Sequence, residues 1–129
     1  MILLDTHALI WLAFEPAQLS NAAREAIGQS VRAGGLGISA ITLWEAAWLL
    51  AHRRIDFIGT PEAFLEGISS RTAVFPITPQ IAIRANQLPA SYPGDPSDRL
   101  IGATAMSEGI PLVTKDRTIR SYKQIKTIW

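Results

Sequence analysis

Short apolar runs alternate with longer helix-forming segments along this chain, and no other feature restricts the possible folds as strongly. A run of four to eight apolar residues bounded by turn-forming residues is typical of a buried strand. Such runs stand at residues 1–5, 36–40, 72–77 and 110–114, with a possible short fifth at 126–129. Strands that alternate with helices predict an α/β fold with a mainly parallel sheet of four to five strands.

Capping residues mark the helices between these runs. One helix is predicted at residues 7–14 and a second at 19–35, with Ser20 as its N-cap. A third is predicted at 42–54, opened by Thr42. Three further helices begin with a capping residue followed by proline, which suits the first helical position. Their caps are Thr60, Thr78 and Asp95.

The composition excludes several kinds of chemistry. The 129 residues include no cysteine and 2 histidines, which rules out disulfides, thiolate zinc sites and multi-histidine metal sites. A content of 48% hydrophobic and 18% charged residues fits one globular domain over residues 1–129. The net charge of +1 neither requires nor excludes a nucleic-acid partner. Any metal here would be held mainly by oxygen, which favours Mg²⁺ or Mn²⁺.

The chain shows no sign of membrane association. Its longest apolar run, residues 8–14, is too short to cross a bilayer. The first residues lack the basic segment and the small-residue cleavage site of a secretory signal. A cytoplasmic protein without a membrane partner is therefore expected.

Four acidic residues stand where a predicted strand has just ended or a helix has just begun. They are Asp5, Glu45, Asp98 and Asp116, with Asp95 close to Asp98. The carboxyl ends of parallel strands meet at one edge of a sheet, which is where ligands bind in open α/β folds. Acids that are distant in sequence can therefore converge there.

Each acid also has a purely structural interpretation. Asp5 could cap the following helix, and Glu45 lies three residues after Thr42, as in a capping box. Asp98 stands at the third position of its helix, where a negative charge suits the helix dipole. Asp116 could be a turn residue.

Two other helices of the chain argue against a purely structural role for Asp98. The two helices that begin with Thr-Pro carry Ala63 and Ile81 at the position equivalent to Asp98. A carboxylate is therefore not needed there to start a helix. Clustered carboxylates also repel one another unless a cation neutralises them, and a divalent metal with oxygen ligands would do so.

Four segments together resemble a known family. The segments MILLDTHALIWL, ISAITLWEAAW, DPSDRLIGATA and PLVTKD look like those of the PIN-domain ribonucleases, in particular the VapC toxins of type II toxin–antitoxin systems. The resemblance implies a PIN-like α/β/α sandwich and a Mg²⁺- or Mn²⁺-dependent endoribonuclease that cleaves RNA phosphodiester bonds with a metal-activated water. It also implies a cognate VapB-type antitoxin and a homodimer.

The family's acidic residues carry over onto Asp5, Glu45, Asp98 and Asp116 as the catalytic set. Of these, Asp5, Asp98 and Asp116 are expected to bind metal, directly or through water, and Glu45 to position a water or a second metal. Supporting roles are possible for Asp95, Arg99, Thr6 and Thr114. Arg99 could pair with an acid of the cluster, meet the scissile phosphate, or only hold the helix start. Thr6 could cap the first helix.

Two surface features could serve partners. The basic stretch that contains Lys115, Arg117 and Arg120 could follow an RNA backbone, or it could be an ordinary solvated segment. Trp44 and Trp48 lie one helical turn apart, a spacing most often found in a core, but they could also line an antitoxin groove or a dimer contact.

Other classes of protein fit the sequence less well. In an aspartate-nucleophile phosphatase a second acid normally stands two positions after the first, where this chain has His7. A phosphate-accepting receiver domain would need an aspartate at the end of a middle strand, and neither candidate strand ends in one. Another Mg²⁺-dependent phosphate-processing enzyme, or a non-catalytic binding module with the PIN fold, remains as the alternative.

Overall fold

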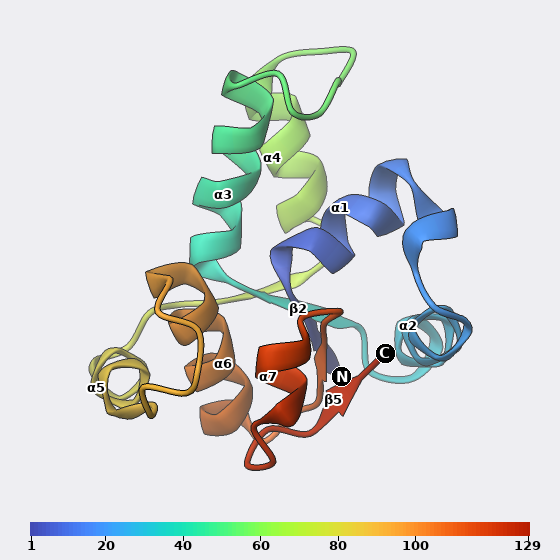
Figure 1. Cartoon of the computed structure of the whole chain (residues 1–129). Helices are drawn as coiled ribbons and strands as arrows, with labels where there is room; N and C mark the ends of the chain where they lie inside the picture. Colours follow the sequence, from blue (N-terminus) through green and yellow to red (C-terminus); the bar gives the residue numbers. More distant parts are fainter.

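A computed structural model describes all residues from 1 to 129 and contains one five-stranded, entirely parallel sheet. The strands are β1 (Ile2–Leu4), β2 (Leu36–Ser39), β3 (Ala73–Phe75), β4 (Leu112–Val113) and β5 (Thr127–Ile128). Their order is β3-β2-β1-β4-β5, so the first strand of the chain lies in the centre of the sheet. Figure 1 shows the helices arranged around these strands. The predicted parallel α/β sheet is confirmed, with strands shorter than the apolar runs that contain them.

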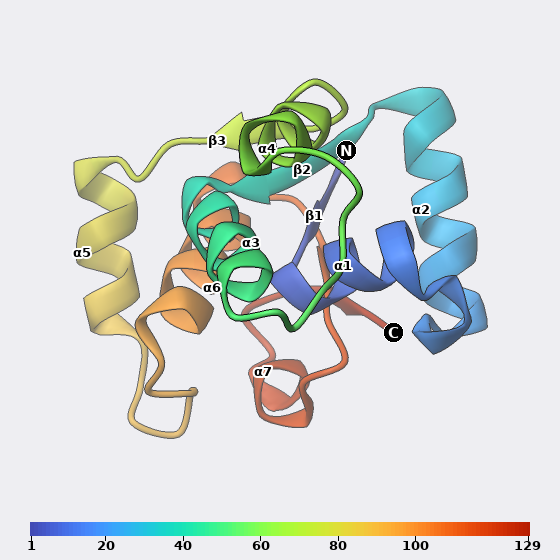
Figure 2. The ribbon, with the colours of Figure 1, turned by 90° about the horizontal axis from the view of Figure 1, so that it is seen from above.

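Helices connect the strands and cover both faces of the sheet. They are α1 (Thr6–Phe14), α2 (Asn21–Ala33), α3 (Ala40–Ala51), α4 (Pro61–Ser69), α5 (Pro79–Gln87), α6 (Pro96–Glu108) and α7 (Arg117–Ser121), with a 3₁₀ turn η1 (Pro16–Gln18). Figure 2 shows α2 and α5 at opposite ends of the molecule, with α1, α3 and α6 between them. The η1 turn and the short α7 were not predicted.

The alternation of side chains along β1 produces the two-sided core. Ile2 and Leu4 pack into a cluster with residues of α1 and α2. Leu3 points to the other face, where it joins a cluster with residues of α6 and α7. Successive side chains of a strand point to opposite faces, so these two clusters make β1 the buried centre of an α/β/α sandwich.

Most predicted helix starts are confirmed by their capping hydrogen bonds. The hydroxyls of Ser20, Thr60 and Thr78 accept hydrogen bonds from the third residue after each of them, at 3.1 to 3.2 Å. The prediction that Thr42 opens α3 is wrong, because the helix begins at Ala40 and Ser39 is its N-cap. Thr42 lies inside the helix and is completely buried. No helix of the fold is both long and apolar enough to cross a membrane.

Candidate functional site

Three of the aspartates are helix N-caps, and the capping hydrogen bonds fix the direction of their side chains. The Asp5 carboxylate accepts a hydrogen bond from the Ala8 N–H at 2.8 Å, and the Asp95 carboxylate accepts one from the Ser97 N–H at 2.8 Å. The Asp116 carboxylate accepts one from the Ile119 N–H at 2.9 Å and thereby starts α7. Three of the predicted acids therefore take part in local structure as N-caps.

The sheet brings Asp5 and Asp116 to the same edge. Strands β1 and β4 are parallel neighbours, with Leu4 paired with Val113. Asp5 follows β1 directly, and its N–H donates to the Val113 carbonyl at 3.1 Å. The Thr114 hydroxyl accepts the N–H of Asp116 at 3.1 Å and so helps to set the chain between β4 and α7. The predicted convergence at the carboxyl ends of the strands is thus present for these two acids.

Glu45 reaches this edge from α3 and is held by a threonine of α1. The Thr6 hydroxyl donates to the Glu45 carboxylate at 2.5 Å and lies 3.1 Å from the hydroxyl of the buried Thr42. Glu45 is therefore not the capping-box residue of its own helix, because that helix begins at Ala40. Asp5, not Thr6, caps α1.

The pKa of Asp98 reflects its burial and the charges of the other four acids. Burial is the largest cause that raises the pKa of Asp98 to about 6, and the negative charges of Asp95, Asp116, Glu45 and Asp5 contribute to the same rise, in that order of effect. A carboxyl that is affected by four others shares one electrostatic environment with all of them. Asp98 is half-buried in the first turn of α6.

Burial also dominates at two other members of the set. It raises the pKa of Asp5, against the opposing effects of the Thr114 hydroxyl and the Ala8 N–H. It likewise raises the pKa of Glu45, and the Thr6 hydroxyl works in the opposite direction. Acids that resist ionisation for these reasons are common at functional sites, where a bound cation or a substrate offsets the cost.

The oxygen atoms of the candidate ligands suit a hard divalent cation, although no three of these side chains surround a single point. All candidate ligands are carboxylate or hydroxyl oxygens, and repulsion among the carboxylates would be relieved by positive charge. No three of the acidic or histidine side chains lie close enough to hold one ion between them alone. Mg²⁺ commonly retains several of its waters, so a combination of direct and water-mediated contacts suits this arrangement.

A family profile described as PIN domain matches residues 2–125 of the chain. The chain belongs to the PIN-domain family. It is 42% identical, over 99% of its length and 98% of the relative's, to ribonuclease VapC22 of Mycobacterium tuberculosis. The expected family is therefore confirmed.

Solved structures of the same fold agree with this assignment. The PIN domain superposes on a chain of DNA-bound VapBC from Salmonella typhimurium with a TM-score of 0.71 and 27% identity, covering 98% of this chain and 97% of the other. It superposes on a chain of promoter-bound VapBC2 from Rickettsia felis with a TM-score of 0.73 and 17% identity, covering 98% and 97% of the two chains. The predicted PIN-like sandwich is confirmed by these superpositions.

Arg99 holds the loop before α6 in place instead of pairing with an acid. Its guanidinium donates to the carbonyls of Leu88 and Pro89 at 2.9 and 3.1 Å, and to those of Ala85 and Tyr92 at 3.3 and 3.4 Å. These carbonyls belong to the end of α5 and the loop that follows. The planar fork of arginine suits such divergent acceptors. The PIN domain thus uses Arg99 to position the segment that carries Asp95 and Asp98.

Tyr92 is a positioning residue that the sequence did not reveal. Its hydroxyl donates to the backbone carbonyl of Asp98 at 2.9 Å, and the side chain is buried. Gly102 makes room for it, since a Cβ there would lie 2.9 Å from the Tyr92 Cζ and closer still to its oxygen. A tyrosine in a polar-looking loop carries no sequence signal for this role, because its partner is a backbone atom.

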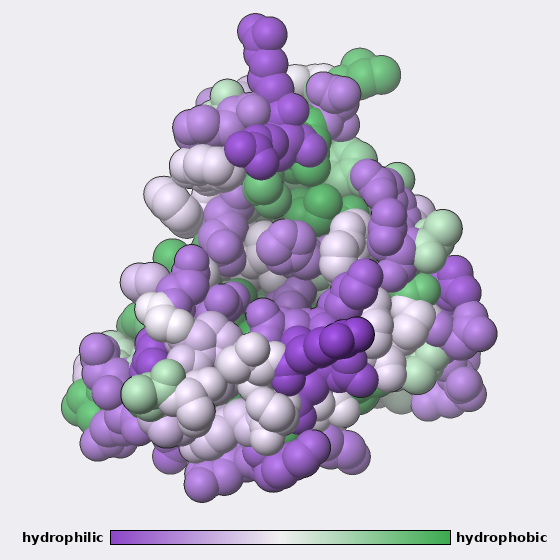
Figure 3. Space-filling model, in the orientation of Figure 1, coloured by the Kyte–Doolittle hydropathy of each residue, from purple (hydrophilic) through white to green (hydrophobic).

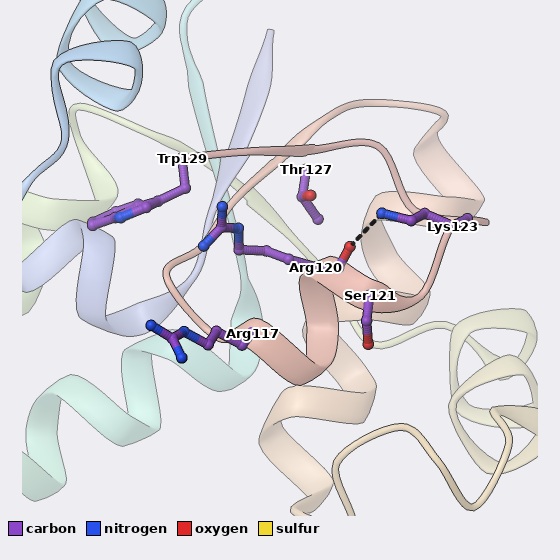
Figure 4. A pocket seen from close by; sticks show the side chains of 6 residues that line it. All are labelled: Arg117, Arg120, Ser121, Lys123, Thr127 and Trp129. Atoms are coloured by element: carbon purple, nitrogen blue, oxygen red, sulfur yellow. Dashed lines mark hydrogen bonds between the residues drawn. The ribbon is translucent and has the colours of Figure 1, made fainter.

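A basic cavity of about 490 Å³ lies between α7 and β5 of the PIN domain (Figure 4). Its lining consists of Arg117, Arg120, Ser121, Lys123, Thr127 and Trp129. Two of the three predicted RNA-binding residues, Arg117 and Arg120, therefore lie together in a cavity. Lys115 lies elsewhere, with its ammonium 5.6 Å from the ring centre of Trp11. Lys123, which belongs to the same basic stretch, also lines the cavity. Trp129 was not predicted from the sequence, and it follows β5, which pairs with β4.

A recess of about 420 Å³, lined by both apolar and charged side chains, separates α1 from the end of α3 and the loop after it. It is lined by His7, Ile10, Trp11, Phe14, Glu15, Leu49, Arg54, Ile55 and Asp56. Figure 3 shows apolar surface in a hollow beneath α3 and α4, with polar residues around it.

Trp44 and Trp48 are not part of this recess. They are 61% and 38% exposed on α3, so the interpretation of this pair as core is wrong.

Proposed function

We propose that this PIN domain, a single domain over residues 1–129, is a metal-dependent endoribonuclease and the toxin of a type II toxin–antitoxin module. The observation that carries the proposal is the shared electrostatic environment of five acids, in which burial and four other carboxylates raise the pKa of Asp98 to about 6. The 42% identity to a ribonuclease over 99% of the chain supports the same reaction class.

Asp5, Asp98 and Asp116 would hold Mg²⁺ or Mn²⁺, directly or through water. When bound, such a cation lowers the pKa of a water and neutralises charge on the leaving oxygen. Glu45 accepts the Thr6 hydroxyl with one oxygen, which fixes its side chain so that it would orient a water or a second metal. Asp95 mainly caps α6 and adds negative charge to the edge.

Calorimetric titration with Mn²⁺ and Mg²⁺, together with a cleavage assay on RNA, tests this site. Asp98→Asn keeps the shape of the side chain and removes its charge, so we expect metal binding and cleavage both to be lost. Asp56→Asn is the matched control, because Asp56 is exposed and lies outside the acid set. Unchanged metal binding and cleavage in Asp98→Asn would show that Asp98 is needed for neither.

The proposed RNA substrate is attracted by cations that adjoin the acids. Lys115 and Arg117 flank Asp116 in the chain, and Arg120 follows on α7. Cations beside a cluster of acids allow a polyanion to approach it, at a salt-dependent gain in affinity. Raising the salt concentration should therefore slow cleavage mainly by lowering the affinity for RNA.

A VapB-type antitoxin is the proposed inhibitor, and the recess beside α1, with its apolar and charged lining, is its proposed docking surface. The related solved structures from Salmonella typhimurium and Rickettsia felis are VapBC complexes, which supports a partner of this type. Expression of the chain alone should arrest growth, and co-expression of a small protein from the adjacent reading frame should relieve the arrest. Arrest by Asp98→Asn as strong as that by the unaltered chain would count against a catalytic toxin.

A homodimer is also proposed, with the exposed Trp44 of α3 as a contact. An indole that is 61% exposed is better covered by a second protein surface than by water. Light scattering should give the dimer mass for the unaltered chain and a lower mass for Trp44→Ser. A monomer under all conditions would reject this part of the proposal.

A further inference from the structure

We propose that Thr42 is a positioning residue for Glu45 and that it acts through the hydroxyl of Thr6. In this hydroxyl relay the Thr42 hydroxyl donates to the Thr6 hydroxyl, which in turn donates to the Glu45 carboxylate. The inference rests on the proposed ribonuclease function, in which Glu45 orients a water or a second metal. It adds a completely buried residue that touches neither metal nor RNA and yet fixes where the Glu45 carboxylate lies.

The direction of the two hydrogen bonds follows from the number of hydroxyl protons. The Thr6 Oγ1 lies 2.5 Å from a Glu45 carboxylate oxygen, and an ionised carboxylate can only accept, so the single proton of Thr6 lies in that bond. The same Oγ1 lies 3.1 Å from the Thr42 Oγ1. Since Thr6 has no second proton to donate, Thr42 is the donor of this bond whenever Glu45 is ionised.

Thr42 can serve the relay because its hydroxyl does not bond to its own helix. A threonine inside a helix commonly donates to the carbonyl four residues before it. The equally buried Thr104 of α6 does so, with its hydroxyl 2.7 Å from the Leu100 carbonyl. The hydrogen-bond partner of the Thr42 hydroxyl is instead Thr6, on another helix. A buried hydroxyl without a partner is unfavourable, so the two threonines hold each other in place.

The relay fastens α3 to the start of α1, and Figure 2 shows these two helices next to each other. Thr42 and Glu45 lie three residues apart on α3, so both can reach Thr6, the first residue of α1. Thr6 directly follows Asp5, whose N–H donates to the Val113 carbonyl and whose carboxylate caps α1. One hydroxyl thus ties Glu45 to the residue beside Asp5, which keeps the two acids in a fixed relation.

Glu45 needs this support because its surroundings oppose a fixed, ionised carboxylate. Its side chain is only partly buried, so packing alone does not select one position for it. Burial first, and then the negative charge of Asp95, raise the pKa of Glu45, whereas the Thr6 hydroxyl lowers it. A hydroxyl that itself accepts a hydrogen bond is a stronger donor. Thr42 therefore strengthens the bond that holds Glu45.

NMR measurement of the Glu45 side-chain torsions tests the relay without any cleavage, using the full chain in EDTA at pH 8. The unaltered chain should show a single rotamer for Glu45. Thr42→Val replaces the hydroxyl by a methyl group and should give averaged couplings, whereas Thr42→Ser keeps the hydroxyl and should retain the single rotamer. Thr104→Val is the matched control, because it removes an equally buried hydroxyl that bonds within its own helix.

A double-mutant cycle tests whether Thr42 acts through Thr6. Cleavage of RNA in Mn²⁺ should fall about 10-fold or more in Thr6→Val, which loses a hydrogen bond to a charged group, and about 3-fold in Thr42→Val, which only weakens that bond. The loss should appear in kcat with KM for RNA unchanged, since Thr42 does not contact the substrate. In the Thr6→Val background, Thr42→Val should have no further effect.

Melting temperatures close to that of the unaltered chain establish that the variants fold. If Thr42→Val is destabilised, Thr42→Ala is the second variant, with the same averaging expected. A single Glu45 rotamer in both variants would overturn the proposal, as would a double variant whose loss of cleavage equals the product of the two single losses. Averaged torsions in Thr42→Val without cleavage by the unaltered chain would reject only the ribonuclease function, whereas cleavage with an unaffected Glu45 rotamer would reject only the relay.

Discussion

Replacing Asp98 by asparagine should make the metal-free protein more stable while it removes the proposed function. The pKa of Asp98 is raised from 3.8 to about 6, first by burial and then by the surrounding carboxylates. The folded state therefore binds this proton more tightly than the unfolded state does. As pH rises from about 4 to 6 the carboxyl ionises at a cost to folding, and above pH 6 the whole cost is present.

The size of the effect follows from the shift. A difference of about 2.2 pKa units corresponds to at most about 3 kcal/mol at neutral pH. Because Asp98 is only half-buried, solvent screening reduces this to about 1–2 kcal/mol. Loss of a favourable charge near the helix start costs about 0.5 kcal/mol. The net gain of about 1 kcal/mol should raise the melting temperature by about 3–4 °C for a domain of this size.

Differential scanning calorimetry in EDTA, at pH 8 and at pH 4.5, measures this effect. We expect Asp98→Asn to melt higher than the unaltered chain at pH 8 and nearly equally at pH 4.5, where Asp98 is protonated. Addition of Mn²⁺ should stabilise the unaltered chain only, since a ligand stabilises the state that binds it. Asp56→Asn should change neither result. A variant that melts at or below the unaltered chain at pH 8 would refute the argument of repelling charges.

Three further predictions concern the packing around the acids. Gly102→Ala should destabilise the fold by about 1–3 kcal/mol in urea denaturation, because its Cβ would collide with Tyr92. Tyr92→Phe should partly rescue it, and strictly additive losses would contradict the contact. Arg99→Lys should lower the free energy of unfolding by about 1–3 kcal/mol, because one ammonium cannot donate to all four carbonyls that the guanidinium contacts. An unchanged thermal midpoint would refute this. Thr6→Val should raise the pKa of Glu45 by removing the hydroxyl that stabilises its charge. Carbon-13 NMR titration of the glutamate carboxyls measures that shift. An unchanged pKa of Glu45 in the variant would show that the Thr6 hydroxyl does not stabilise its charge.

The features predicted best from the sequence are those set by local chemistry. The Thr-Pro and Asp-Pro helix starts and the central apolar strand depend on residues within a few positions of one another. The placement of Asp5 at the sheet edge also follows from a simple rule, because it directly follows a strand. The proposed roles of the acids as metal ligands remain predictions, which the titrations above test.

The errors arose where a tertiary contact outweighed a local pattern. Thr42 and Glu45 match the spacing of a capping box, but Ser39 starts the helix three residues earlier, and both side chains turn to Thr6 on another helix. Arg99 follows an acid in sequence but bonds to carbonyls of a different segment. Such partners are not visible from local spacing, since they belong to other segments of the chain, as Thr6 on α1 does for Thr42 and Glu45.

The central position of β1 also has a consequence for the order in which the protein is made. The recess beside α1 is built from residues 7–56, whereas the acid edge needs Asp116 and the pairing of Leu4 with Val113. At about 5–20 residues per second, a ribosome adds Asp116 roughly 6–22 s after Asp5. The residues that line the proposed docking surface are therefore synthesised several seconds before the acid edge can be completed. We expect an inhibitor already present in the cell to have that interval in which to bind.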